Sequence, residues 1–309
     1  MNKILLVANK GRFSEYSYES LKPHSESLSI VYTNEIESAY LKFGFQLSEF
    51  IRRSIGSENF NMVVYIGGEI RNVEAMSMQN FTIPKMFSDY CSDQGIKLIY
   101  LSSLSAYGDV GDILKVSENT RPGPSDSEYS RTKNEFDSYV RLNNVSSGYI
   151  AIQPSSIVGS RHFSSSLDRV ILSLLKYKFL RYIEFSSIIS FIDRKEILDF
   201  IALAIADGEK QGFYILSHNI TISQVQRNIY HENYNPIFDA YNLLNYIYKA
   251  LSSLEKVFNF LFFKNKAKVF KNLVNRTQYK SDRGVCNTVK VNRYISERCE
   301  IIKKSLKSE

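Results

Sequence analysis

The sequence predicts an α/β fold with a doubly wound parallel sheet and a smaller C-terminal α/β portion. Short apolar segments alternate with helical segments through the first half of the chain, as in a sheet covered by helices on both faces. These apolar segments show little polar alternation, which is typical of buried parallel strands. A strand, a loop rich in turn residues and a helix also follow one another between residues 97 and 140.

The expected elements of the first part are short strands with helices between them. We expect strands at Ile4–Ala8, Ser29–Tyr32, Met62–Ile66, Lys97–Leu101 and Gly148–Gln153. Helical spacing covers Ile36–Ile55 and Pro84–Asp93. The order of strands and helices is that of a parallel sheet with crossover helices.

Composition agrees with an ordinary enzyme. The chain has 309 residues, enough to bury a large core in one big domain or two unequal ones. No uncharged apolar run reaches about 18 residues, and Met1–Val7 has the pattern of a first strand rather than of a signal peptide. The cysteines (Cys91, Cys286 and Cys299) are scattered, and the four histidines form no cluster. We therefore expect a cytoplasmic protein without a metal site.

Tyr129 and Lys133 are four residues apart at the start of a predicted helix, so both lie on one helix face. A free tyrosine titrates near pH ~10, and a neighbouring ammonium lowers its pKa toward the range where acid–base catalysis is effective. A serine of the run Ser102–Ser105, directly after a predicted strand, could hold the substrate oxygen. An isolated pair with this spacing is usually a solvated helix face, but the ordered strand, loop and helix favour a site that interconverts a carbonyl and an alcohol.

Three segments in order resemble the extended short-chain dehydrogenase/reductase family, in particular its nucleotide-sugar epimerases, dehydratases and reductases. They are Leu98–Gly108, the Glu118-x-x-Arg121-Pro122 segment and Tyr129–Lys133. The resemblance implies that Ser103, Tyr129 and Lys133 are catalytic. Later segments, at residues 151–159, 191–197 and 212–217, resemble the continuing pattern of the family.

The resemblance also implies a division into two domains. Residues 1–155 would form a Rossmann-like dinucleotide-binding domain, to which segments of the later chain return. Residues 156–309 would form the substrate-binding portion, with an apolar helix and a basic tail. The implied cofactor is NAD or NADP.

The glycine-rich turn of the family departs from its usual pattern, because only one glycine follows the first strand. The family's longer pattern would place Asn9, Arg12 and Glu15 on the three glycine positions. We prefer the shorter Gly-x-Gly-x-x-Gly register, which places Asn9, Gly11 and Ser14 there and keeps a glycine where the backbone meets the pyrophosphate. Asparagine tolerates the left-handed conformation, and Ser14 is small enough for close helix–strand packing.

Charged residues near this turn bear on the choice between NAD and NADP. Lys10 and Arg12 would contact the pyrophosphate or a 2′-phosphate, or they are exposed loop cations without a ligand. The residue that contacts the adenine ribose should follow the second strand, where Asn34 and Glu35 are the candidates. Glu35 would favour NAD and Arg12 would favour NADP, so both cofactors stay open.

Further residues of the cofactor site are implied by position in the family pattern. Gly67 and Gly68 follow the strand at residues 62–66, Asn80 resembles a helix asparagine of the family, and Ser155 lies where the family approaches the nicotinamide. Gln153 stands where the family has an arginine. Ser105 is implied as a substrate contact beside Ser103.

The C-terminal part is basic. Residues 264–309 carry 13 Lys+Arg against 4 Asp+Glu, a net charge of +9, whereas the remainder carries 26 against 28, or −2. An apolar segment with helical spacing, Asn242–Phe263, precedes it. We favour a helix packed on the substrate domain and a basic wall, with Arg276 and Arg283, for a nucleotide diphosphate. Contact with an anionic membrane surface is the less favoured reading.

These observations lead to an NAD(P)-dependent oxidoreductase-type enzyme acting on a nucleotide-activated sugar, as a 4-keto reductase or a 4-epimerase. Dehydration ranks lowest, because the family's acidic pair beside the serine is replaced by Leu104 and Ser105. Surface polysaccharide synthesis would be the pathway by analogy, a homodimer is possible, and no nucleic-acid partner is expected. The alternative is an inactive relative that binds a nucleotide or a protein, which the altered glycine turn motivates.

Overall fold

The computed structural model describes residues 2–44, 47–56, 59–110, 115–143, 148–159, 165–206, 211–258, 276–281 and 291–308. The chain forms two compact units. The first comprises Met1–Gly111, Ser117–Ser155 and Arg194–Leu216, and the second comprises Asp112–Val116, Ser156–Asp193 and Ser217–Glu309.

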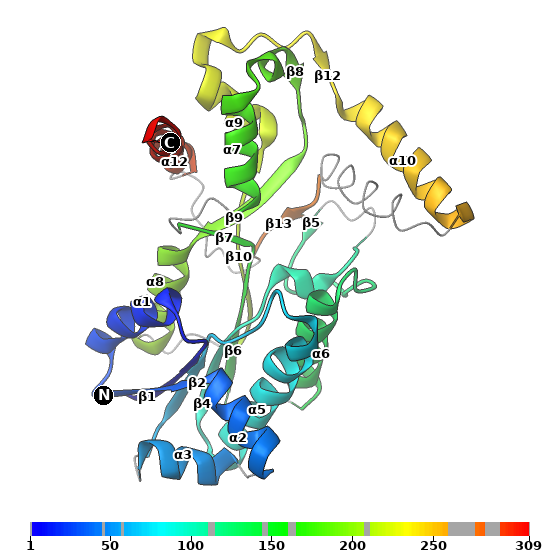
Figure 1. Ribbon diagram of the computed structural model, residues 1–309. Helices are drawn as coiled ribbons and strands as arrows, with labels where there is room; N and C mark the ends of the chain where they lie inside the picture. The colour runs from blue at the N-terminus through cyan, green and yellow to red at the C-terminus, as the bar shows by residue number, and fades with distance from the viewer. Residues whose placement is uncertain are drawn as a thin grey trace. The chain divides into compact units, whose positions relative to one another are not determined.

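The first unit is built on a six-stranded sheet whose strand pairs are all parallel (Figure 1). Its strands are β1 Lys3–Ala8, β2 Ser27–Tyr32, β3 Met62–Tyr65, β4 Lys97–Leu101, β6 Tyr149–Pro154 and β10 Gly212–Leu216. The spatial order is β10-β6-β4-β3-β1-β2. The predicted α/β class and doubly wound parallel sheet are confirmed.

The strand order places a topological switch point between β1 and β3. The chain passes from β1 outward to β2 and then crosses back to β3 on the other side of β1. Ligands of doubly wound sheets bind at the carboxyl ends of the strands where the winding reverses. Within the described residues β2 is the edge strand, so the order is that of the 2-1-3-4-5 class and not the 3-2-1-4-5-6 class.

Helices cover both faces of this sheet (Figure 1). One face carries α1 Arg12–Leu21 and α8 Arg194–Ala206, which contact each other. The other carries α2 Thr33–Phe43, α3 Leu47–Ile55, α5 Ile83–Gln94 and α6 Glu128–Asn143. The short helix α4 Val73–Ser77 continues through a π-helical turn, Met78–Thr82, into α5.

The helical spacing expected over Ile36–Ile55 is divided between two helices, α2 and α3. Gly44 caps α2 in the left-handed conformation, with φ of 57°. A glycine adopts this conformation without a Cβ penalty and thereby ends the helix. The other predicted elements agree with the structure to within one or two residues at each end.

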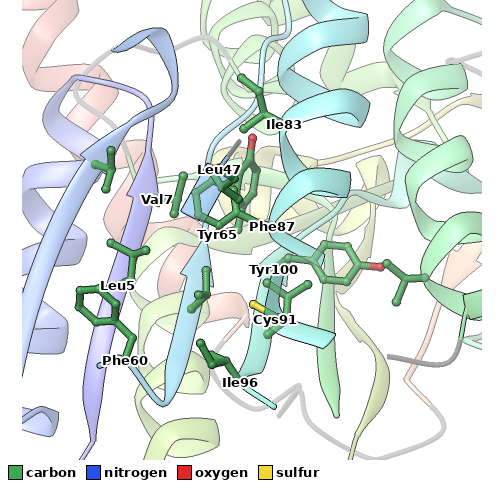
Figure 2. Close-up of a cluster of buried hydrophobic side chains, with 14 of the residues drawn as sticks. Leu5, Val7, Leu47, Phe60, Tyr65, Ile83, Phe87, Cys91, Ile96 and Tyr100 are labelled. Atoms are coloured by element: carbon green, nitrogen blue, oxygen red, sulfur yellow. The ribbon is translucent and has the colours of Figure 1, made fainter. Parts of the chain in front are cut away.

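One core cluster of the first unit lies between the sheet and helices α5 and α6. Figure 2 shows Leu5, Val7, Tyr65, Phe87 and Tyr100 in this cluster, all almost fully buried. Aromatic edges pack against one another, as in the T-shaped pair of Tyr100 with the α6 side chain at position 136, 4.8 Å between centroids. This packing fixes α6 against β4, and both elements carry site residues.

Within the described residues, the second unit contains short strands and four α-helices. A mixed sheet, in the order β11-β9-β7, is formed by β7 Ser156–Val158, β9 Ile188–Asp193 and β11 His218–Thr221. Two further pairs join β8 Ile183–Glu184 to β12 Phe238–Asp239, and β5 Lys115–Val116 to β13 Gln278–Tyr279. The helices are α7 Ser166–Lys176, α9 Ile222–Tyr230, α10 Tyr241–Phe258 and α12 Val291–Ser308.

A buried ion pair joins two helices of this unit. The Arg298 Nε of α12 donates to the Asp168 carboxylate of α7 at 2.7 Å, and both side chains are nearly inaccessible. The predicted apolar helix corresponds to α10, and its continuation to Phe263 lies outside the described residues. In the first turns of α10, Leu243 and Tyr246 are exposed. Of the helices that the structure describes, none is long and apolar enough to cross a membrane.

Candidate active site

Helix α6 and the end of β4 bring the predicted Ser, Tyr and Lys side chains together. Tyr129 of α6 lies beside Ser103, which follows β4 by two residues and lowers the pKa of the Tyr129 phenol. The Lys133 Nζ lies 5.9 Å from the centroid of the Tyr129 ring. The three side chains therefore meet at the carboxyl end of the sheet, where ligands of this fold class bind.

The turn that presents Ser103 is anchored to α6. Ser103 caps a short 3-10 helix, Leu104–Tyr107, and its hydroxyl accepts the N–H of Ser105 at 3.1 Å. The Ser130 hydroxyl donates to the Ser105 carbonyl at 2.6 Å, and the Asn134 amide donates to the carbonyl of residue 106 at 2.7 Å. These bonds fix the Ser103 turn relative to Tyr129.

Two glycines hold the loop that connects this turn with α6. Gly108 has φ of 62°, and a Cβ there would overlap the carbonyl oxygen of Pro124. The Gly123 N–H donates to the Tyr107 carbonyl at 2.8 Å, and the Asp109 N–H donates to the Pro124 carbonyl at 2.8 Å. The two segments thus pack backbone to backbone, which leaves no room for a side chain.

We expect Gly108→Ala to destabilise the protein more than Gly95→Ala, as measured by urea unfolding. Gly95 has φ of 66° with nothing within 4 Å of the Cβ position, so its substitution costs only the backbone strain, about 1 kcal/mol. Gly108→Ala adds a backbone overlap, about 1–3 kcal/mol more. Equal losses for the two variants would contradict the packing argument.

The Lys133 ammonium is buried, with 6% of the residue exposed, and donates to the Leu101 carbonyl at 3.2 Å. Burial lowers its pKa to about 8, and the charge of Asp137 acts in the opposite direction. Burial raises the pKa of Tyr129, and the hydrogen bond with Ser103 lowers it. The Lys133 ammonium is bonded to the Leu101 carbonyl and not to the Tyr129 phenol. The expected lowering of the Tyr129 pKa by Lys133 therefore stays a prediction for the site with cofactor and substrate bound.

Asp137 is a site residue that the sequence reasoning missed. Its carboxylate accepts hydrogen bonds from the Ser102 hydroxyl at 2.7 Å, the Tyr100 hydroxyl at 3.1 Å and the Gln153 amide at 2.8 Å. Burial raises its pKa, whereas these hydrogen bonds and the charge of Lys133 lower it. A buried carboxylate with three donors is fully held, and it acts electrostatically on Lys133.

The spacing along α6 contained the signal for this residue. Tyr129, Lys133 and Asp137 follow at intervals of four, so the three share one helix face. An acidic residue on a face that already carries a buried lysine indicates a charge partner. Gln153, which stands where the family has an arginine, donates to Asp137 without contributing a charge.

Asn9 lies at the switch point between β1 and β3. Its side-chain oxygen accepts the Gly68 N–H at 2.9 Å and the Thr33 hydroxyl at 2.9 Å. Its side-chain nitrogen donates to the Gly68 carbonyl at 2.8 Å and to the Gln79 side chain at 3.3 Å. The first position of the glycine turn therefore carries a side chain that bonds protein groups.

Gly67, Gly68 and Asn80 surround the same crevice. A Cβ at Gly67 would lie 2.5 Å from the methyl group of Thr33, and one at Gly68 would lie 3.2 Å from the Lys133 Nζ. Asn80 bonds both backbone groups of Glu69, each at 2.8 Å. These residues are close to the candidate site, and their contacts are with protein groups.

The turn before α1 fits a dinucleotide pyrophosphate. A Cβ at Gly11 would meet nothing within 4 Å, so the backbone is open to a ligand, and Ser14 is buried against the turn with its hydroxyl donating to the Gly11 carbonyl at 2.6 Å. The open backbone at the N-terminus of α1 matches what a phosphate requires. Arg12 and Glu35 are both exposed, the latter in the first turn of α2.

The remaining predicted residues lie elsewhere. Ser155 is buried where β6 ends, and its N–H donates to the Leu216 carbonyl at 3.1 Å. Arg276 belongs to the second unit, where it lines an open pocket of about 280 Å³ together with Lys115, Ser186, Ile188 and Gln278. Arg283 lies outside the described residues.

The fold is a doubly wound parallel sheet, and Ser, Tyr and Lys side chains lie together at the carboxyl ends of its strands. Such a site is suited to proton transfer at a carbonyl or an alcohol. Comparison with family models supports this class. The model of the NAD dependent epimerase/dehydratase family matches residues 49–212, more than half of the chain. The chain belongs to this family. The match begins after β1, α1 and the glycine turn.

Solved structures with similar folds include three bacterial proteins. The Bordetella bronchiseptica enzyme WbmG in complex with NAD has 12% identity and a TM-score of 0.56, over 91% of this chain and 97% of that chain. A dTDP-4-dehydrorhamnose reductase from Yersinia enterocolitica has 18% identity and a TM-score of 0.54, over 77% and 83%. A UDP-glucose 4-epimerase from Thermotoga maritima has 13% identity and a TM-score of 0.54, over 76% and 85%. At these identities the likeness establishes the fold. A search of curated proteins returns no match.

Proposed function

We propose that this protein is an NAD(P)-dependent enzyme that acts on a nucleotide-activated sugar as a 4-keto reductase or a 4-epimerase. The observation that carries the proposal is that α6 and the end of β4 place Tyr129 beside both Ser103 and the buried Lys133. Family membership supports the substrate class. Surface polysaccharide synthesis would be the pathway by analogy with the family.

Each residue of the trio has a distinct task. Tyr129 donates a proton to a ketone oxygen, or removes one from a sugar hydroxyl, in the two directions of the same step. Ser103 donates a hydrogen bond to that oxygen and keeps it within reach of the phenol. Lys133, when protonated, stabilises the phenolate that forms as the proton leaves Tyr129. A nicotinamide bound beside them would supply or accept the hydride at the same carbon.

The residues beside Ser103 favour redox chemistry without elimination. Elimination of water needs a second acid–base pair next to the serine, and this position holds the buried Leu104 and the exposed Ser105. A single hydride delivery makes the enzyme a reductase, and return of the hydride to the opposite face of the sugar makes it an epimerase. The apolar helix of the C-terminal part leads us to rank the reductase first.

The cofactor would be held by the turn before α1 and by the crevice at the switch point. Gly11 and the N-terminus of α1 would receive the pyrophosphate, with Arg12 or Lys10 as charge partners. Gly67, Gly68, Asn80 and Ser155 would border the rest of the dinucleotide. Arg12 would suit NADP, and Glu35 would suit NAD.

The pocket of the second unit would take the diphosphate of the substrate. The Arg276 guanidinium stacks on the Tyr241 ring at 3.4 Å from its centroid and donates to the Ser186 hydroxyl at 2.8 Å. These two contacts hold a planar cation at the edge of the pocket, where Lys115 adds a second cation. Arginine in a fixed orientation is well suited to phosphate oxygens.

We expect Arg276→Ala to raise the KM for the sugar nucleotide by about 10-fold or more and to leave kcat within about 3-fold, since it removes charge-assisted bonds to a part of the substrate that does not react. Steady-state kinetics would measure both constants. Arg293→Ala is the matched control, because this arginine is exposed on α12, where its Nε pairs with Glu297 at 2.8 Å. An unchanged KM in Arg276→Ala would remove Arg276 from the substrate site.

The proposal is tested by incubation of the protein with 4-keto and 4-hydroxy sugar nucleotides in the presence of NADH, NADPH or NAD. Oxidation of the reduced cofactor with a 4-keto sugar would support the reductase, and interconversion of 4-epimers with bound NAD would support the epimerase. Cofactor binding without turnover of any such sugar would favour an inactive relative that binds nucleotides. The altered glycine turn, with Asn9 and Ser14, is the observation that keeps this second function in consideration.

A further inference from the structure

Asn9 connects the carboxyl ends of three adjacent strands. It follows β1 directly, Thr33 follows β2 directly, and Gly68 lies three residues after the end of β3. Both backbone groups of Gly68 are bonded by the one Asn9 side chain, N–H to oxygen at 2.9 Å and carbonyl to nitrogen at 2.8 Å. This bidentate pairing crosses the switch point between β1 and β3.

The Asn9 amide has no bonding capacity left for a ligand. An asparagine amide offers two acceptor positions and two donors, and Thr33 and Gln79 fill the two that Gly68 leaves. Gln79 is itself fixed, because its amide donates to Glu37 at 2.7 Å and its backbone carbonyl accepts the Tyr65 hydroxyl at 2.9 Å. The side chain of Asn9 is therefore a structural connection and not a direct contact to a cofactor.

This connection lies below the turn and leaves the pyrophosphate position open. At the packed end of the sheet, a Cβ on Gly67 would lie 3.1 Å from the Asn9 side-chain oxygen. A Cβ on Gly11, in contrast, would meet no atom within 4 Å. A glycine at position 9 would leave both backbone groups of Gly68 without these partners. Loss of partners for polar groups in a packed crevice is costly, so Gly68 would move.

Movement of Gly68 would reach the catalytic lysine. The Cβ position of Gly68 lies 3.2 Å from the Lys133 Nζ and 2.9 Å from the Asn80 side-chain oxygen. Asn80 bonds both backbone groups of the next residue, Glu69, and donates to Thr132 at 3.2 Å. Two asparagines thus hold two successive residues of the loop that follows β3, directly beside Lys133.

We propose that Asn9 is a positioning residue that holds Gly68 as the floor of the dinucleotide crevice, so that restoring the family glycine at this position weakens cofactor binding. The proposal rests on the proposed function. The usual pattern has at this first position a glycine that permits a tight turn, whereas this chain has a side-chain amide that bonds the loop after β3. Asn9→Gly would therefore remove the bonds that hold Gly68 and would lower the affinity for the cofactor.

The test compares the Kd for NADH and NADPH, from nicotinamide fluorescence, among wild type, Asn9→Gly and a matched control. Asn61→Gly is that control, because Asn61 connects β3 to β1 at the opposite, amino end of the strands, where its side chain accepts the Lys3 N–H at 3.0 Å. We expect Asn9→Gly to raise Kd about 10-fold or more and Asn61→Gly to leave Kd unchanged. Thr33→Val, which removes one bond to Asn9 and keeps the side-chain shape, should give a smaller increase and serves if Asn9→Gly does not fold.

Hydrogen exchange of the peptide that contains Gly68, measured without cofactor, provides the independent readout. We expect faster exchange in Asn9→Gly than in Asn61→Gly. Equal or tighter cofactor binding by Asn9→Gly, or unchanged exchange at Gly68, would overturn the proposal. If wild type binds neither cofactor, the proposed function fails and so does the role of Asn9 toward a cofactor, whereas faster exchange would still be seen.

Discussion

Replacement of Tyr129 by phenylalanine is expected to lower kcat by about 10²–10⁴-fold, the usual contribution of a positioned acid or base. The change removes the phenol hydroxyl, whose pKa Ser103 lowers, and keeps the ring that lies beside Lys133. The Kd of NADH or NADPH should therefore stay within about 2-fold. Turnover of a 4-keto sugar nucleotide and cofactor fluorescence measure the two quantities on the same preparation.

Tyr139→Phe provides a matched control for this substitution. Tyr139 also lies on α6, but its hydroxyl contacts Asp89 of α5 and the Lys85 ammonium lies over its ring, away from Ser103. We expect this variant to keep wild-type kcat. Turnover that survives in Tyr129→Phe, or that is lost equally in both variants, would refute the proton-transfer role of Tyr129.

Replacement of Asp137 by asparagine is expected to move the alkaline limb of the kcat/KM profile to lower pH. Burial already lowers the pKa of Lys133 to about 8, and the Asp137 charge is what raises it. Without that charge the ammonium loses its proton at a lower pH, and the protonated lysine that stabilises the phenolate is lost there. At a pH above the alkaline limbs of both the wild type and the variant, kcat/KM falls by about 10-fold for each pH unit by which the limb is moved.

The surroundings of Asp137 make this a test of charge and not of folding. Ser102 and Tyr100 donate to one carboxylate oxygen of Asp137, and the Gln153 amide donates to the other. The Gln153 amide group can rotate by 180° to present its oxygen instead of its nitrogen. The Tyr107 hydroxyl donates to Gln153. Burial raises the pKa of Tyr107, the charge of Arg141 lowers it, and the charge of Glu118 raises it. An amide at position 137 can keep most of these bonds.

Asp89→Asn is the control, because Asp89 pairs with Lys85 at 2.8 Å on the exposed side of α5. Its pH profile should match that of wild type. The rate at which Lys133 reacts with an amine-specific reagent, followed by mass spectrometry against pH, gives the lysine titration without any turnover. An alkaline limb that stays in place in Asp137→Asn would show that Asp137 does not set the charge of Lys133.

The lowered pKa of Lys133 also makes the free energy of unfolding depend on pH. The pKa of Lys133 is about 8 in the folded protein and 10.5 for an ordinary lysine. Between these values the unfolded chain binds more protons than the folded one, so this group makes the free energy of unfolding rise with pH through that window. The burial of Lys133 is thus a cost to stability below pH 8 that the site retains.

The sheet and the proximity of Ser103, Tyr129 and Lys133 could be predicted because their signals are local. Apolar runs identify the strands, and the four-residue spacing of Tyr129 and Lys133 depends only on helix geometry. Asp137 has the same kind of signal, but an acidic residue on a helix is usually solvated, and only the packing of β4 and β6 shows that it is buried. The division between α2 and α3 depended on Gly44, whose left-handed conformation the apolar periodicity did not reveal.

The crevice could not be predicted because its contacts join residues far apart in sequence. Asn9 meets Thr33, Gly68 and Gln79 only after three strands have paired, so a pattern of spaced glycines assigns it a role without showing its contacts. Glu35 was expected at the end of the second strand, but α2 begins at Thr33 and leaves it on an exposed first turn. Strand order, which the sequence did not define, determines both outcomes.

The central claim is that a crevice with a single glycine in its turn still binds a nicotinamide dinucleotide next to Tyr129. The most direct measurement is titration of the wild-type protein with NADH and with NADPH, with nicotinamide fluorescence as the signal. We predict a saturable change with at least one of them at micromolar concentrations, and displacement of that ligand by its oxidised form. No change with either cofactor up to high micromolar concentrations would contradict the claim.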